Sequence, residues 1–193
     1  MSLHALLATA TRPAHDALER SLDLERDLSP ANYGLYLRCM HAFLRETEGA
    51  LAEDPRLADC GLALDARRKL PWLERDLDAL GLEALEPTET PVLPADIHRR
   101  IGWVYVLEGS TLGGRVLYRR IAPHLHLSAE RGAAFLNGHG EHTGEMWKRF
   151  VAALDALPLT GAQSLECVAG AREAFAAVGD FFIACGWPNR AAP

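Results

Sequence analysis

Residues 103–121 read WVYVLEGSTLGGRVLYRRI, an apolar helical pattern that contains Gly109, Gly113 and Gly114. A glycine inside a helix is about 1 kcal/mol less favourable than alanine, so the three together cost about 3 kcal/mol. The i, i+4 spacing of Gly109 and Gly113 is typical of close contact between two helices. Gly114 enlarges the surface without side chains, and a flat backbone face also suits a planar ligand. The pattern alone leaves both interpretations open.

The rest of the chain is also helical in pattern. Ser29 and Pro30 form a helix start, a capping residue followed by proline in the first turn, and that helix extends to about residue 51. Pro13 predicts a kink or a restart in the first helix, with Thr11 as a plausible N-cap. Further helices are predicted over 70–80 (ended by Gly81), 95–123, 128–137, 143–157 and 160–185, with 82–94 as a loop. We expect an all-α, single-domain multi-helix bundle over residues 1–193.

Composition excludes several classes of function. The net charge of −6 argues against binding to nucleic acid and to an anionic membrane surface. No apolar run approaches the length of a membrane span, and the N-terminal residues do not resemble a secretory signal. The four cysteines lack zinc-like spacing. We therefore expect a reduced, cytoplasmic protein.

Among the histidines, His15 has the most informative surroundings. It lies on the apolar face of the first helix, and Glu19 follows one turn later. A metal-bound imidazole usually donates its second N–H to a carboxylate, a carbonyl or water. A purely structural His–Glu pair explains the same spacing. The E-x-x-H pairs of di-iron bundles, the phosphate-binding loops and the G-x-S-x-G motif are all absent from the sequence.

Four stretches together resemble the haem oxygenase family, most closely its bacterial, bacteriophytochrome-associated branch. They are TRPAHDALE at 11–19, YVLEGSTLGG at 105–114, TGEMWKRF at 143–150 and AREAFAAVGDFF at 171–182. Their order and spacing cover most of the chain. The resemblance implies an all-α fold that holds haem between a proximal helix and a kinked distal helix.

The resemblance also implies roles for individual residues. His15 would be the axial iron ligand and Glu19 its carboxylate partner. The distal helix would offer the glycines to the haem face, with Ser110 near the haem edge or a distal water. The implied catalytic residues are His15, Gly109, Ser110 and Gly113, and the implied haem-binding residues are His15, Glu19, Tyr105, Gly109, Gly113, Gly114, Lys148 and Phe175. Tyr105 and Lys148 match positions that contact the haem propionates, and Phe175 matches a pocket aromatic.

The family's reaction consumes haem, which is both cofactor and substrate, together with O2, and yields biliverdin, CO and ferrous iron. Electrons would come from an external ferredoxin or reductase, because the chain has no nucleotide or flavin motif, and a bacteriophytochrome could receive the biliverdin. Two alternatives stay open: a haem-binding or storage protein of the same fold without turnover, and a TenA-like helical enzyme acting on another small molecule.

The sequence departs from the family at two positions. A propionate-binding lysine of some members is replaced by Ala8, for which Arg12 is a candidate substitute. The distal aspartate of the mammalian branch is replaced by Ser110. Both changes leave the regiochemistry of the product open.

Overall fold

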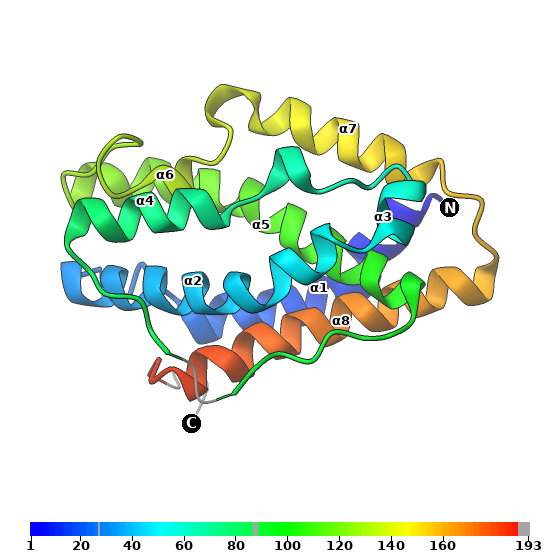
Figure 1. The fold of residues 1–193 in the computed structure, drawn as a ribbon, viewed down its shortest axis with the longest axis horizontal. Coiled ribbons are helices and arrows are strands. Elements are labelled where there is room, and N and C mark those ends of the chain that lie inside the picture. The colour runs from blue at the N-terminus through cyan, green and yellow to red at the C-terminus, as the bar shows by residue number, and fades with distance from the viewer. Residues whose placement is uncertain (27, 87–88, 189–193) are drawn as a thin grey trace.

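A computed structural model describes residues 1–26, 28–86 and 89–188 (Figure 1). Among these residues there are helices and turns but no strand, in agreement with the expected all-α fold. The principal helices are α1 (Leu3–Leu22), α2 (Pro30–Ala52), α4 (Leu70–Leu80), α5 (Ile97–His124), α7 (Thr143–Asp155) and α8 (Gly161–Ala184); shorter turns are α3 (Pro55–Asp59), η1 (Asp65–Arg67), α6 (Ala134–Asn137) and η2 (Gly140–His142).

Several helix ends follow the local sequence signals. The Ser29 hydroxyl caps α2 by accepting from the backbone N–H of Asn32, with Pro30 in the first turn. Gly81 ends α4 with a φ of 64°, a left-handed conformation that favours glycine. Thr160 and Gln163 form a reciprocal capping box at the start of α8.

Two local predictions are wrong: a restart of the first helix at Pro13 with Thr11 as its N-cap, and a continuous helix over 128–137. Helix α1 has no restart: it is capped by Ser2, and Thr11 is buried inside it with its hydroxyl donating to the Leu7 carbonyl. Pro13 is tolerated because it and Thr9, whose carbonyl loses its partner, are both exposed to water. The helix predicted over 128–137 is confined to α6, because Gly132 has a φ of 80° and the preceding residues form a tight turn.

Helix α5 runs obliquely through the middle of the ribbon, with α7 on one side and α1 and α8 on the other (Figure 1). Its main packing partner is α8, and the two backbones meet at Gly102 and Gly170. A Cβ added at Gly102 would lie 2.1 Å from the Cys167 carbonyl oxygen, and one added at Gly170 would lie 2.1 Å from the Arg99 carbonyl oxygen. Glycine is therefore required at this crossing.

The hydrophobic core lies where α2, α5 and α8 converge. Phe43 packs between Trp103, with parallel rings 6.3 Å apart, and Phe181, with an edge-on contact at 5.5 Å. All three side chains are buried. Within the described residues, no helix is long and apolar enough to cross a membrane.

Candidate functional site

Two contacts connect helix α5 to the segment that contains α1, one near the middle of α1 and one just beyond its C-terminal end. At one end the phenol of Tyr105 lies beside the side chain of Thr11, whose hydroxyl donates to the Leu7 carbonyl. Beyond the other end of α1, Nη1 of Arg120 donates to Oε2 of Glu25 at 2.9 Å. The helical rise makes the interval between these contacts about 20 Å long. Over this interval both helices pack on α8 rather than closely on each other.

The predicted site residues lie along this interval. Residues four apart share a helix face, so His15 follows Thr11 on the same side of α1, and Gly109 follows Tyr105 on the same side of α5. Gly113 is one turn further along α5. Helical spacing therefore places the predicted proximal histidine on α1 and two of the three glycines on α5 between the same two contacts.

The three glycines of GSTLGG have different neighbours. Around Gly113, which is exposed, an added Cβ would have no packing neighbour within 4 Å. At Gly109 it would meet only the Trp147 ring, at 3.9 Å. Gly114 is buried, and its Cβ would meet the backbone of Leu136 in α6 at 3.5 Å. Gly114 therefore allows packing against α6 and does not share the open face, contrary to the expectation that it enlarges that face.

Apolar side chains flank the open glycine face. Leu112 is 39% exposed and Val116 is 50% exposed, although both belong to a helix at the centre of the fold. Exposed apolar side chains grouped on one helix face are a common feature of ligand-binding surfaces. The close backbone contact that explains Gly102 and Gly170 does not explain Gly113.

The His15 side chain is half exposed, and one of its nitrogens is directed at carboxylates. Nδ1 lies 3.5 Å from Oδ1 of Asp16 and 3.6 Å from Oε2 of Glu19. The ring is also in edge-on contact with Phe175, at 5.8 Å between centroids. Carboxylates beside Nδ1 favour the tautomer that is protonated there, which leaves Nε2 as the free ligand atom. Sequence reasoning identified Glu19 and missed Asp16, which follows His15 directly.

The propionate-contact candidates lie around the Tyr105 end of the interval. Tyr105 packs against Trp147 at 5.9 Å and against His4 at 6.2 Å between ring centroids. Burial raises the pKa of Tyr105, so its phenol stays protonated and can donate a hydrogen bond. Lys148, next to Trp147, is exposed and has no ion-pair partner in the part of the chain that the structure describes.

Two further positions concern the departures from the family pattern. Ser110 is half-buried, and its hydroxyl donates to the Leu107 carbonyl of its own helix at 2.7 Å. Its single proton is therefore used within α5. Arg12 is exposed, one turn before His15, and Ala8 is half-buried on the same helix.

A buried charge cluster lies directly beside the glycine stretch, and sequence reasoning missed it. Oε2 of Glu108 accepts from Nη1 of Arg67 at 2.7 Å, and Oε1 accepts from Nζ of Lys69 at 2.9 Å. Glu48 accepts from the backbone N–H groups of Lys69 and Leu70 at 2.7 and 2.9 Å. The available signal was an acidic residue within the apolar run VYVLEGS.

The described residues thus form an all-α protein with an open glycine face on α5 and, on α1, an exposed histidine beside two carboxylates. The family model for Heme oxygenase matches residues 1–184. A heme oxygenase of Xanthomonas campestris pv. campestris is 32% identical over 146 residues, covering 75% of this chain and 84% of that protein. The chain therefore belongs to the haem oxygenase family.

Other relatives and solved structures agree with this assignment. Heme oxygenase PigA of Pseudomonas aeruginosa is 29% identical over 173 residues, covering 88% of this chain and 86% of that protein. The NO- and CO-bound heme oxygenase of Neisseria meningitidis superposes with a TM-score of 0.82 at 29% identity, covering 97% and 94% of the two chains. Heme oxygenase from Leptospira interrogans has the same fold, with a TM-score of 0.76 at 19% identity and coverage of 94% and 98%. The family assignment favours the haem interpretation over a TenA-like enzyme, and the bacteriophytochrome-associated branch stays a prediction.

Proposed function

We propose that this protein cleaves haem oxidatively to biliverdin, CO and ferrous iron, using O2 and electrons from an external donor. The observation that carries the proposal is the open backbone at Gly113, along the same interval as His15. A planar macrocycle would fit a helix face without side chains, and the His15 imidazole, with its Nδ1 beside carboxylates, would hold the iron through Nε2.

The residues present suit haem as the occupant. Neutral imidazole is a common iron ligand, and Asp16 and Glu19 would hold the His15 ring in one tautomer and orientation. Leu112 and Val116, which are now exposed to water, would be covered by the apolar macrocycle, and this burial favours binding through the hydrophobic effect. Haem, when bound, supplies both the iron that activates O2 and the ring that is cleaved.

The surrounding side chains would orient the macrocycle. The Tyr105 phenol and the Lys148 ammonium provide a hydrogen-bond donor and a cation for the propionates, with Arg12 as a further cation. Phe175 would support the His15 ring and one edge of the macrocycle. Gly109 and Gly113 would keep acid–base side chains away from O2 bound on this side, and Ser110 would offer only an oxygen that accepts hydrogen bonds.

The electron donor and the fate of the product follow from the same proposal. A ferredoxin or a flavin-containing reductase would supply electrons, and a bacteriophytochrome is the candidate acceptor of biliverdin. A haem-binding or storage role without turnover is the alternative that experiment must separate from this one.

Haemin titration tests the binding step. Purified protein should develop a Soret band with haemin, and His15→Ala should abolish or shift that band. His142→Ala is a matched control, because its side chain is 81% exposed and lies beyond α6. Absence of haemin binding by the unaltered protein would refute the proposal.

Turnover is tested by adding an electron donor in air to the haemin complex. The oxygenase predicts decay of the Soret band with growth of biliverdin absorption and release of CO. A stable spectrum in the presence of ferredoxin and its reductase supports the storage alternative.

A further inference from the structure

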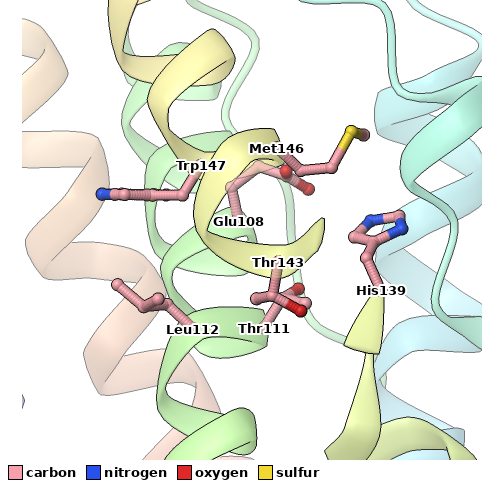
Figure 2. Close-up of a pocket in the computed structure, with 7 residues that line it drawn as sticks. All are labelled: Glu108, Thr111, Leu112, His139, Thr143, Met146 and Trp147. Atoms are coloured by element: carbon pink, nitrogen blue, oxygen red, sulfur yellow. The ribbon is translucent and has the colours of Figure 1, made fainter. Parts of the chain in front are cut away.

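A groove lies between α1 and α8, which pack along each other (Figure 1). Its volume is about 450 Å³, which is space for several side chains. The hollow between α5 and α7 that Figure 2 shows has a volume of only about 10 Å³ and is too small for a side chain. The groove is therefore the one of these two sites that another protein segment could enter.

Small side chains form much of the groove. Helix α1 contributes Ala14, Ala17 and Ser21, and α8 contributes Ala176 and Gly179. Because these side chains are short, a second helix could approach the backbones of both α1 and α8 closely.

Helix α8 also presents a ridge along the edge of this groove. The ridge consists of Arg172, Ala176, Asp180 and Ile183, which share one face of the helix and are all exposed. Ile183 is 44% exposed although it is a large apolar residue. An exposed apolar side chain beside an open groove is a common feature of surfaces that bind another protein.

The two charged residues of the ridge are placed symmetrically. Arg172 lies four residues before Ala176 and Asp180 lies four residues after it, so each is about 6 Å from Ala176 along the helix axis. The Arg172 guanidinium donates through Nε and Nη2 to the Ala10 carbonyl at 3.2 and 3.0 Å, which holds it in place and leaves Nη1 available. Asp180 has no ion-pair partner in the part of the chain that the structure describes.

We propose that this groove binds the α8 ridge of a second copy of the chain, in a symmetric dimer. A twofold axis at Ala176, perpendicular to α8, makes the two α8 helices antiparallel, so each ridge lies in the groove of the other copy. Arg172 of each copy then faces Asp180 of the other. Ile183, seven residues after Ala176, faces the small Ala169, seven residues before it.

The charge order along α8 is the reason for choosing a second copy as the occupant. The order is positive, small, negative, and an antiparallel copy reverses it. Reversal about Ala176 brings opposite charges together at both ends of the contact, and complementary charges of this kind fix the register of an interface.

The proposed haem site lies apart from this interface. Helix α5 contributes no lining residue to the groove, and neither His15 nor Glu19 lines it. Phe175 is shared, because it lines the groove and contacts the His15 ring. Substitutions at Arg172 and Asp180 should therefore change self-association and leave haemin binding unchanged.

Sedimentation equilibrium of the haem-free protein tests the proposal. The average mass should rise from that of one chain toward that of two as the concentration increases to about 1 mM, where even weak specific dimers form. Arg172→Asp sets like charges together at both contacts and should raise the dissociation constant of the dimer about tenfold or more. Asp180→Arg should have the same effect, and it serves alone if Arg172→Asp does not fold. A chain that stays monomeric over this range would overturn the proposal.

The double variant Arg172→Asp/Asp180→Arg is the decisive comparison. It restores opposite charges at both contacts, so its dissociation constant should return to within about threefold of that of the unaltered protein. A double variant as weak as the single ones would overturn the arrangement. Arg119→Asp is the matched control, because it makes the same charge change at an exposed residue of α5 that does not line the groove. Equal weakening by Arg119→Asp would also count against the proposal.

Haemin titration of the same variants keeps this test separate from that of the proposed function. Each variant should develop the same Soret band as the unaltered protein. Failure of the unaltered protein to bind haemin would refute the proposed function, whereas the dimer is decided by sedimentation alone.

Discussion

Replacing single glycines of α5 by alanine should change stability in opposite directions. Gly113→Ala adds a methyl group where no packing neighbour lies within 4 Å, so only helix propensity acts, and the gain is about 1 kcal/mol. Gly102→Ala adds the same methyl group 2.1 Å from the Cys167 carbonyl oxygen and 2.5 Å from the Ala171 nitrogen.

The clash at Gly102 involves backbone atoms, which cannot rotate away. Relief requires α5 and α8 to separate by about 1 Å, and overpacking of this kind costs about 1–3 kcal/mol or more. Since propensity returns about 1 kcal/mol, the net effect is a loss of up to about 2 kcal/mol or more. For a chain of this size, each kcal/mol corresponds to a change in Tm of about 2–4 °C.

Urea unfolding of the protein without haem, followed by far-ultraviolet circular dichroism, measures both changes. The midpoint should rise for Gly113→Ala and fall for Gly102→Ala, with equal m-values. A fall in the Gly113→Ala midpoint would mean that this position is packed, and it would refute an open ligand face at Gly113. A Gly102→Ala protein as stable as the parent would refute the close helix crossing.

Three further outcomes follow from individual contacts. Gly113→Leu should fold and yet lose haem turnover, because a bulky side chain fills the open face; normal turnover would count against that face. Tyr33→Phe should lower the free energy of unfolding by about 1 kcal/mol, since the buried phenol donates to the Gly132 carbonyl at 2.8 Å, and unchanged urea unfolding would contradict this. The hydrogen bond from Arg56 lowers the pKa of Asp54 to about 2, below its unfolded value. The stability it contributes is therefore complete above pH 4 and lost as the pH falls toward 2, so Asp54→Asn should flatten the dependence of urea stability on pH in that window.

The sequence predicted helix boundaries best where a capping residue or a terminal glycine acts locally. Ser29 with Pro30 and Gly81 act through bonds within a few residues, so their effect does not depend on the rest of the fold. The predicted helix restart at Pro13 was wrong because the missing hydrogen bond is harmless on a solvent-facing side of a helix. Which side faces solvent is decided only by the folded chain.

The candidate site was predictable in part. In the sequence, Gly109, Gly113 and Gly114 look alike, as three glycines within one helical pattern. Only the fold shows that Gly114 packs on α6 while Gly113 remains open. The glycines that do mediate a helix crossing, Gly102 and Gly170, lie far apart in sequence with no motif to join them. Their pairing is visible only when α5 and α8 are placed side by side.

The Gly102–Gly170 crossing has a mechanical consequence. Because no side chain separates the two backbones, the helices can rotate about this crossing but can hardly shift there. Gly113 lies about 16 Å further along α5. A tilt of about 5° at the crossing would move Gly113 by about 1.5 Å. That displacement is a sizeable fraction of the thickness of a flat ligand. If haem binds this face as proposed, the width available to it would be set at a point that it does not touch, and a substitution at Gly102 or Gly170 should appear first as a change in the fit of the bound haem.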